Sequence, residues 1–472
     1  MQVESGAFVE KARAALTDAT LQHALKHIKH GFVEARAGAA ARLPGFEAMR
    51  DRARDIRAHT LAHLAEHLER FEANVTALGG HVHWAADAEE ARAIVVRLCR
   101  EKGARTVTKS KSMVTEEIEL NPALEAAGIA PVETDLGEYI IQLRHEKPSH
   151  IIAPVIHLSK DQVADTFHAE HPKYGFTERL TERPALVREA RAILRERFLK
   201  ADVGITGANF LVAETGSAVV VTNEGNADLT ASLPDTHIVV TGIEKVVPTL
   251  ADCHTLLRLL PRSATGQDIT AYVSFFTGPK RAADLSGPSS FHVVLVDNGR
   301  SSMLGTEFEE MLRCIRCGAC LNHCPVYANV GGHAYGSVYP GPMGAVLTPS
   351  LAGIDKAGHL PNASSFCGRC EAVCPVRIPL PKMMRHWRER EFERHLSPAP
   401  MRWGLGLWAA LAARPALYRL ALGLASRLLR GRATKGWIGR LPLAGAGWTG
   451  GRDLRAPSGG TFQQQWRRRR GG

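Results

Sequence analysis

Hydrophobic and polar positions follow different periods in different parts of the chain. Up to about residue 75, apolar positions recur at helical spacing with many charges between them, as in EAMRDRARDIRAHTLAHLAEHLERFEANV (47–75). This spacing predicts an N-terminal helical region over residues 1–75.

From about residue 80 the pattern changes to short apolar strands that alternate with helical segments. Such alternation implies βαβ units and a mostly parallel sheet, so we expect an α/β domain over residues 76–300. Its strands are expected at HVHWA (81–85), RTVTKS (105–110), IAPVET (129–134), IVVTGIEKVVP (238–248) and FHVVLVDNG (291–299), with two more around a turn in Val203–Asn226.

Residues 301–390 contain most of the cysteines, and we expect short helices joined by Gly- and Pro-rich loops. Residues 391–472 form a Leu-, Trp- and Arg-rich extension that is expected to be helical. From Pro398 onward this tail has fourteen Lys and Arg residues and one acid, so its net charge is +13 and that of the rest is −2. No recognition fold accompanies the charge, and we do not expect nucleic acid binding.

Two interpretations compete for the tail. Its apolar stretch from Trp403 is too short to span a bilayer, and the leucines and arginines that follow suggest an amphipathic helix. That helix would either pack on a partner subunit, which we favour, or lie on an anionic membrane surface as a peripheral contact. The stripe consists of Leu417, Leu420, Leu424 and Leu428, with Arg419, Arg427 and Arg430 between them.

The N-terminal residues, MQVESGAFVEKARAAL, contain no continuous apolar segment of the kind found in signal peptides. No stretch of the chain reaches the roughly 18 apolar residues of a spanning helix. We therefore expect a cytoplasmic protein.

Seven of the nine cysteines lie within 61 residues. CIRCGACLNHCP (314–325) has the four-cysteine spacing of bacterial ferredoxins, and CGRCEAVCP (367–375) repeats it one cysteine short. In two-cluster ferredoxins the cysteine before proline binds the other cluster. The spacing therefore predicts one [4Fe–4S] site with four thiolates and a second with three. The first set is Cys314, Cys317, Cys320 and Cys374, and the second is Cys324, Cys367 and Cys370.

The missing ligand of the second site falls at Ser364, three residues before Cys367. The second cluster is then either [4Fe–4S], with its fourth iron held by Ser364, a water or a partner's ligand, or [3Fe–4S]. His323 and His359 are nearby candidates, although a loop histidine is more often only exposed. The other two cysteines, Cys99 and Cys253, are expected to be buried hydrophobic residues.

Zinc is the alternative metal, since paired C-x2-C motifs also form four-thiolate zinc sites. It does not account for two Cys-Pro endings or for three cysteines at even spacing. The iron–sulfur interpretation is therefore preferred.

Long segments outside the cysteines resemble the lactate utilization protein B family. They include Thr108–Leu143, NFLVAETGSAVVVTNEGNADLTASLPDTHIVVTGIEKVVP (209–248) and GHAYGSVYPGPMGAVLTP (332–349). The resemblance implies an α/β domain like that of CoA transferases and sugar-phosphate isomerases, followed by a helical two-cluster ferredoxin domain. It also implies two partners, a second cysteine-rich iron–sulfur subunit and a small α/β subunit.

The leading functional hypothesis is an electron-transfer subunit of a system that oxidises L-lactate to pyruvate. Clusters transfer single electrons, so oxidation of a hydroxy acid needs a separate site. The alternatives are an enzyme in which the incompletely bound cluster takes the hydroxy acid directly, and a subunit of a related glycolate-type oxidase.

Polar residues in the α/β domain are candidates for binding a carboxylate, although a β-turn with core strands and a solvated strand end are the preferred explanation. No G-x-G-x-x-G motif follows a strand, so a dinucleotide site is not expected. The candidates are Lys109, Lys111, Glu214, Thr215 and Asn226.

Overall fold

The computed structural model describes residues 1–442, 445–458 and 460–470. It divides into two compact units, Met1–Glu391 and Phe392–Gly472, which are described separately. The larger unit contains the predicted N-terminal helices, the α/β domain and the cysteine-rich region together.

A six-stranded sheet forms the centre of the larger unit, in the order β1-β10-β7-β4-β2-β3. Every neighbouring pair is parallel, which confirms the predicted parallel sheet. Its strands are β1 (His81–Ala85), β2 (Thr106–Lys109), β3 (Ala130–Glu133), β4 (Val203–Thr206), β7 (Thr236–Gly242) and β10 (Ser290–Val296).

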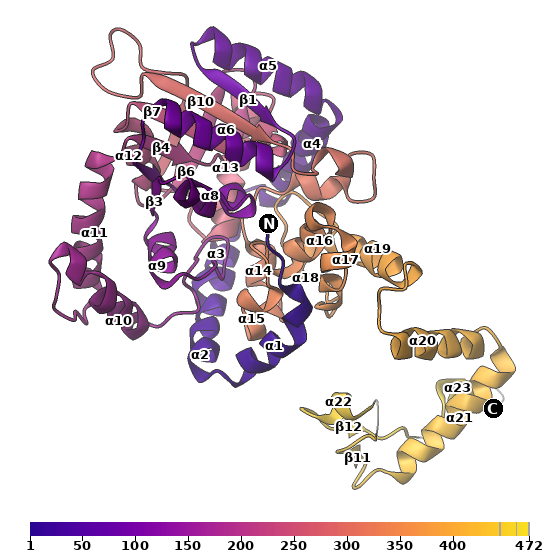
Figure 1. The fold of residues 1–472 in the computed structure, drawn as a ribbon. Helices are drawn as coiled ribbons and strands as arrows, with labels where there is room; N and C mark the ends of the chain where they lie inside the picture. The colour runs from indigo at the N-terminus through magenta and orange to yellow at the C-terminus, as the bar shows by residue number, and fades with distance from the viewer. Residues whose placement is uncertain (443–444, 459, 471–472) are drawn as a thin grey trace. The chain divides into compact units, whose positions relative to one another are not determined.

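Both faces of this sheet are covered, which explains its nearly continuous apolar strands. In β10, Val294 and Val296 face a core shared with α6, whereas Val293 and Leu295 face a core shared with α5. The helices on the first face are α6 (Ala88–Glu101), α7 (Met113–Glu117) and α8 (Leu120–Ala126) (Figure 1). The side chain of Asp87 caps α6 by accepting a hydrogen bond from the amide of Glu90.

The segment Val203–Asn226 contains three strands, so the prediction of two was wrong. After β4 the chain forms an antiparallel hairpin that belongs to a second sheet, in the order β8-β5-β6-β9. Gly207 follows β4, and the close approach of Ser112 requires glycine there, because a Cβ would lie 2.7 Å from the Ser112 hydroxyl. The strands are β5 (Phe210–Val212), β6 (Ser217–Thr222), β8 (Val246–Val247) and β9 (Tyr272–Phe276).

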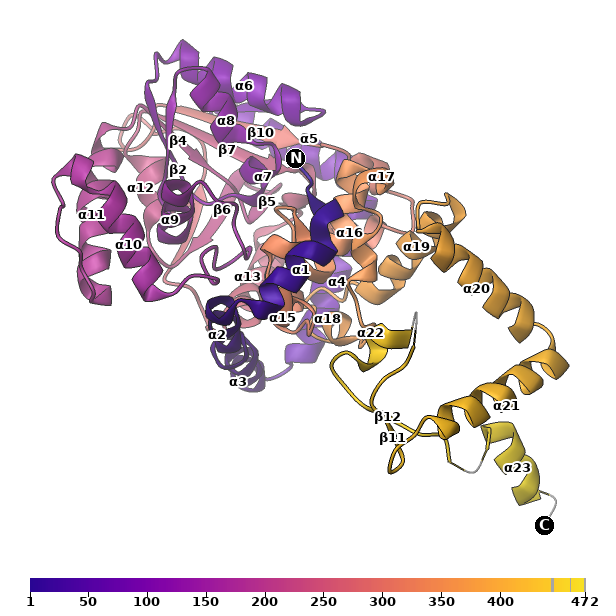
Figure 2. The ribbon, with the colours of Figure 1, turned by 60° about the horizontal axis from the view of Figure 1, so that its bottom comes forward.

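The N-terminal region is helical to Ala77, as predicted. Its first helices lie against the cysteine-rich region, where α1 and α2 both contact α15 (Figures 1 and 2). The region consists of η1 (Ser5–Ala7), α1 (Phe8–Thr17), α2 (Ala19–Ile28), the π-helical η2 (Lys29–Glu34), α3 (Ala35–Ala41), α4 (Phe46–Ala62) and α5 (Leu64–Ala77).

Five further helices and two short turns complete the α/β domain. Three helices that follow β3 share a small core of their own, with Tyr139 and Phe167 among its residues. The elements are α9 (Leu136–Arg144), α10 (Lys160–Glu170), η3 (Pro172–Tyr174), α11 (Arg183–Lys200), α12 (Asn226–Ser232), η4 (Ile243–Lys245) and α13 (Leu250–Ala264).

The cysteine-rich region consists of short helices joined by loops, as predicted. Its apolar side chains pack with those of the N-terminal helices and α13 in one core. The elements are η5 (Ser301–Met303), η6 (Glu309–Arg313), α14 (Ala319–Asn322), α15 (Tyr327–Val330), η7 (His333–Tyr335), α16 (Gly341–Ala352), α17 (Ile354–Ala357), η8 (Leu360–Asn362), α18 (Arg369–Ala372) and α19 (Leu380–Glu393).

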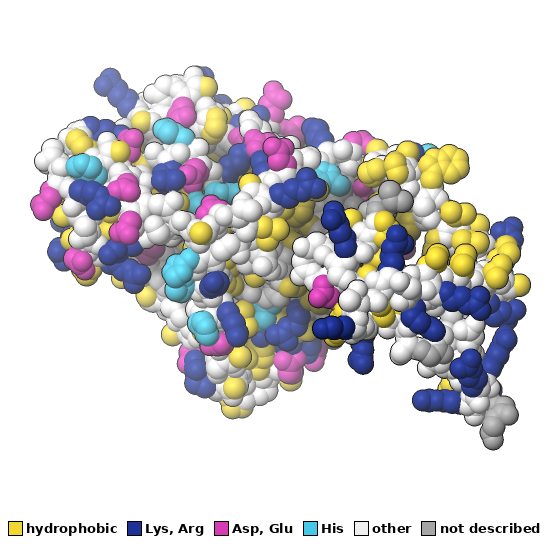
Figure 3. Space-filling view, turned by 90° about the horizontal axis from the view of Figure 1, so that it is seen from below, with side chains coloured by type: hydrophobic (Ala, Val, Ile, Leu, Met, Phe, Trp, Pro, Cys, Tyr) yellow, Lys and Arg dark blue, Asp and Glu magenta, His cyan; other side chains and the backbone are white. Residues whose placement is uncertain are grey.

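The C-terminal unit contains two longer helices and several short elements. Hydrophobic and basic side chains gather on its surface (Figure 3), and the predicted leucine stripe lies exposed along α21. Within the described residues no helix has both the length and the apolar character needed to cross a bilayer. The elements are α20 (Ala399–Ala412), α21 (Pro415–Gly431), β11 (Trp437–Ile438), α22 (Ala446–Thr449), β12 (Leu454–Arg455) and α23 (Phe462–Arg470).

Candidate iron–sulfur site

Four cysteines from both runs line one cavity. They come from the loop before α14, from α14 itself and from the turn after α18, and apolar residues such as Ile315 and Leu380 fill the spaces between them. The four are those expected from ferredoxin spacing to share a cluster: Cys314, Cys317, Cys320 and Cys374.

The other three cysteines lie near one another. Burial, together with the neighbouring Cys324 and Cys367, raises the pKa of Cys370 to about 12. Cys324 and Cys370 are buried, whereas Cys367 is exposed. This second group is therefore open to solvent on one side.

The two cysteine runs have the same backbone conformation. Arg316 and Gly318 have φ values of 58° and 72°, and the equivalent Phe366 and Gly368 have 54° and 78°. The Arg316 amide donates a hydrogen bond to the Cys314 sulfur at 3.4 Å. Thiolates that bind iron in ferredoxin loops accept such bonds.

Ser364 occupies the position in the second run that Cys314 occupies in the first. The amide of Phe366 donates to the Ser364 hydroxyl oxygen at 3.1 Å, just as the amide of Arg316 donates to Cys314. The serine thus retains the local geometry of a ligand position without the thiol.

The thiol environment fits a bound metal group. Burial raises the pKa of Cys317 to about 12 and that of Cys374 to about 11. A thiol with such a pKa is protonated at neutral pH and is a poor nucleophile or redox group. Iron supplies the positive charge that would make thiolates stable in this place.

Three arginines of the N-terminal helices hold the cysteine loops. Arg36 donates to the carbonyl of Val373 at 2.8 Å, and Arg50 donates to those of Ala372 and Cys374. Arg57, on α4, donates to the carbonyl of Leu312 at 2.9 Å. The helical region thereby fixes the backbone on which the cysteines lie.

A buried ionic network joins the α/β domain to the cysteine-rich region. Arg300 forms two hydrogen bonds with Glu117, at 2.9 and 2.7 Å, and one with Glu244 at 2.7 Å. Tyr339 donates to Glu117 at 2.6 Å, and Arg316 lies 3.3 Å from Glu244. Arg300 and both glutamates are almost inaccessible to solvent.

The candidate carboxylate-binding residues do not form one group. Lys109 is fully buried between Glu116 and Glu133, at 2.9 and 2.7 Å, so the expectation of a solvated strand end was wrong. Glu214 and Thr215 lie in the turn of the β5–β6 hairpin, as the alternative interpretation of that segment proposed.

The other two candidates, Lys111 and Asn226, line a cavity at the carboxyl ends of β3, β2, β4 and β7. Sequence analysis missed Lys245 and Arg316, which also line it. The signal was available for Lys245, because a Glu-Lys pair interrupts the apolar run IVVTGIEKVVP.

The remaining candidates are engaged in protein contacts. His323 and His359 are half-buried, and each has a ring nitrogen within hydrogen-bonding distance of a backbone carbonyl, those of Ala319 and Ser5. Cys99 and Cys253 are buried, as expected.

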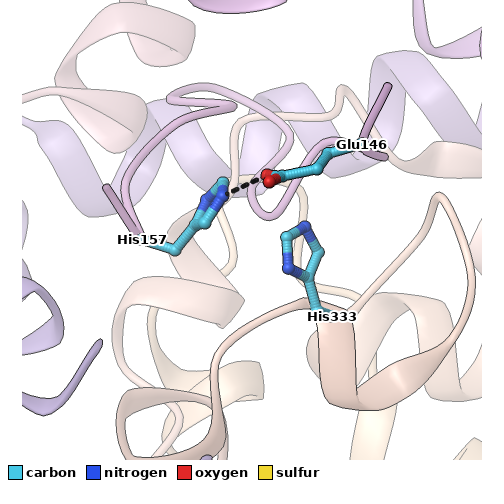
Figure 4. Close-up of side chains that lie close together, drawn as sticks. All are labelled: Glu146, His157 and His333. Atoms are coloured by element: carbon cyan, nitrogen blue, oxygen red, sulfur yellow. Dashed lines mark hydrogen bonds and ion pairs between the residues drawn. The ribbon is translucent and has the colours of Figure 1, made fainter. Parts of the chain in front are cut away.

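A histidine pair that sequence analysis did not consider joins the segment after α9 to the cysteine-rich region (Figure 4). His157 lies 2.9 Å from Glu146, and the rings of His157 and His333 are 4.5 Å apart. Glu146 also pairs with Arg144 at 2.7 Å, and His333 bonds the carbonyl of Lys147. These hydrogen bonds explain the grouping of Glu146, His157 and His333 as a structural connection between the two segments.

Two protein-family models match the α/β domain and the cysteine-rich region separately. The LUD domain family matches residues 68–296, and the 4Fe-4S dicluster domain family matches residues 310–378. A crystal structure of a DUF162 family protein from Deinococcus radiodurans is 14% identical, with coverage of 49% of this chain and 98% of that one. Its TM-score of 0.27 is too low to bear on the fold.

Curated relatives match over the full length. Lactate utilization protein B of Bacillus pumilus is 45% identical over 471 residues, which are 99% of this chain and 98% of the relative. The protein of the same name from Geobacillus thermodenitrificans is 45% identical over 475 residues, 100% and 99% of the two chains. The chain, with its LUD domain and its iron–sulfur dicluster domain, belongs to the lactate utilization protein B family.

Proposed function

We propose that this chain is an iron–sulfur electron-transfer subunit of a multi-subunit system that oxidises L-lactate to pyruvate. The observation that carries the proposal is the division of seven cysteines into a group of four and a neighbouring group of three. The names of the relatives supply the link to lactate utilization.

The proposed ligands are assigned by group. Cys314, Cys317, Cys320 and Cys374 would hold a [4Fe–4S] cluster. Cys324, Cys367 and Cys370 would hold a second cluster, which is either [3Fe–4S] or [4Fe–4S] with a ligand other than cysteine. Such clusters accept and donate single electrons. The protein's own contribution is to bury the first group, to donate amide hydrogen bonds to sulfur, and to hold the loops through the N-terminal arginines.

A second candidate function is an enzyme that binds a hydroxy acid at the incompletely bound cluster. The exposure of Cys367 favours this alternative, because a ligand can reach that site from solvent. A lactate–dye reduction assay of the cluster-loaded chain separates the two. The electron-transfer proposal predicts no reduction by this chain alone and reduction when its partner subunits are added. Lactate-dependent reduction by the isolated chain would favour the enzyme.

The proposed partners are a second cysteine-rich iron–sulfur subunit and a small α/β subunit. A related glycolate-type oxidase remains the alternative system. The similarity of the α/β fold to that of CoA transferases and sugar-phosphate isomerases also remains a prediction from the family resemblance.

Ser364→Ala is expected to retain the second cluster. A serine hydroxyl has a far higher pKa than a thiol and is a weak iron ligand at neutral pH. Ser364→Cys should add a thiolate in the geometry of Cys314, and this variant would convert a three-iron site to a four-iron site. Electron paramagnetic resonance of both variants, with iron analysis, measures the result. Loss of the second cluster in Ser364→Ala would instead establish serine as its ligand.

The leucine stripe of α21 is expected to bind a partner subunit. Replacing Leu420 and Leu424 by Gln should reduce co-purification of the partners, since both side chains are exposed and apolar. The matched control replaces Arg419 and Arg427 by Gln on the same helix. If the leucine variant keeps its partners and loses only salt-sensitive pelleting with anionic liposomes, α21 binds membranes instead.

A further inference from the structure

The cavity at the carboxyl ends of the parallel strands has a volume of about 260 Å³. Ser110 follows β2, Gly207 follows β4 and Asp135 follows β3, so three crossover loops form one wall. In open α/β sheets this end of the strands is where ligands bind. The volume suits a molecule smaller than a nucleotide, since drug-sized ligands occupy about 300–1,000 Å³.

One cation in the cavity wall has no partner. Lys245 is only 6% exposed, and no residue in 1–442, 445–458 or 460–470 forms a hydrogen bond or ion pair with its ammonium group. The adjacent Glu244 is already bound by Arg300 and Arg316. The Lys245 ammonium thus shares its neighbouring carboxylate with two arginines, and an anionic ligand in the cavity would complete its pairing.

The charges of the other lining residues balance. Two further cations, Lys111 and Arg316, oppose two acids, Asp135 and Glu224. Both acids accept hydrogen bonds from backbone amides, which stabilise their charged form. The remaining charge is one positive unit, from three cations and two acids.

A neutral hydrogen-bonding group lies in the same wall. The hydroxyl oxygen of Ser110 is buried, and within the described part of the chain it has no hydrogen-bond partner. A ligand that carries both a negative charge and a hydroxyl or carbonyl group would satisfy Lys245 and Ser110 together.

The cavity adjoins the four-cysteine group. Ile151 and Arg316 line both spaces. Ile151 and Ile152 pack against Gly318 of the cysteine run, where a Cβ would lie 3.2 Å from the Ile152 side chain. His150 fixes this segment, because its ring lies 2.9 Å from the side-chain oxygen of Asn322 and accepts hydrogen bonds from the amides of Ile152 and Ala153.

We infer that this cavity binds a small carboxylate anion that carries a hydroxyl or oxo group, with Lys245 as its charged partner and Ser110 as a hydrogen-bonding partner. The inference deepens the proposed function and rests on it only for the chemical class of the anion. The inference assigns to the cavity the binding of the anion and no chemical reaction. A phosphate ester is less suitable, because among the residues that the structure describes no glycine-rich strand-to-helix turn lines the space.

Isothermal titration calorimetry of the cluster-loaded full chain, under anaerobic conditions, tests the inference. The probes are L-lactate, pyruvate, the neutral lactamide and inorganic phosphate. We expect both carboxylates to bind and lactamide not to bind. Lys245→Met should weaken carboxylate binding by about tenfold or more, since a hydrogen bond to a charged group is lost. Lys102→Met, which removes an exposed lysine after α6, is the matched control and should bind normally.

Iron and sulfide are measured for each variant, so that a folding defect is recognised. If Lys245→Met loses its clusters, Ser110→Ala provides the second test, because it removes the proposed hydrogen-bonding hydroxyl and should weaken the binding of both carboxylates, and unchanged binding there would also overturn the inference. The inference is overturned if neither carboxylate binds, if Lys245→Met binds them normally, or if phosphate binds as tightly as lactate. Carboxylate binding without electron transfer in the assembled system would contradict the proposed function and leave the inference standing.

Discussion

Cys374→Ser is expected to abolish the four-thiolate cluster and to leave the second cluster in place. The residue belongs to the second cysteine run, yet its side chain lines the cavity of the first. Its loss leaves three thiolates in a buried, apolar space where a serine hydroxyl is a poor substitute. The measured iron content should fall by up to about four atoms per chain. Magnetic circular dichroism, with electron paramagnetic resonance, would show which signal disappears.

Cys99→Ala is the control for this substitution. It removes a buried thiol of α6 that lies in another core and is not a proposed ligand. The control should retain both clusters. If Cys374→Ser instead removed only the signal that Cys367→Ser removes, the assignment of Cys374 to the first cluster would be wrong.

Arg300→Met is expected to destabilise the larger unit by about 3–5 kcal/mol, because it leaves Glu117 and Glu244 buried without their shared cation. Both carboxylates are charged in the intact network, where Arg300 opposes the effect of burial and holds the pKa of Glu117 below its usual value. Urea denaturation, followed by circular dichroism, measures the change in unfolding free energy.

Two further variants make this experiment specific. Arg54→Met removes an exposed arginine that pairs with Asp51 and Asp55 on the surface, and it should change stability little. Arg300→Met combined with Glu117→Met should be less destabilised than Arg300→Met alone, because one of the unpaired charges is gone. A loss in Arg300→Met no larger than that in Arg54→Met would refute a structural role for the network.

Local patterns predicted much of the α/β domain. Helical segments were expected between the strands, and α6 follows β1 over Ala88–Glu101 with Asp87 as its cap. The boundary between β4 and β5 could not be found in this way. Both strands are fully buried, so the burial pattern of the segment gives no sign that the chain passes from one sheet to the other between them.

The candidate site could be predicted where ligand chemistry fixes the spacing of the cysteines in the sequence. It was harder to predict where long-range contacts determine the surroundings of a side chain. Ferredoxin spacing assigned Cys374 to the first group, and the structure brings those four side chains together. The burial of Lys109 could not be predicted, since it depends on Glu133 of a neighbouring strand. Lys245 was overlooked although a Glu-Lys pair interrupts its apolar run, and only its place in the cavity wall depends on loops from other strands.

The central claim is that this chain holds two iron–sulfur clusters of unequal ligation. Quantitative analysis of iron and acid-labile sulfide in anaerobically purified protein tests it most directly. The account predicts about seven or eight of each per chain, from the compositions of the clusters. A single bound zinc with no sulfide would contradict it.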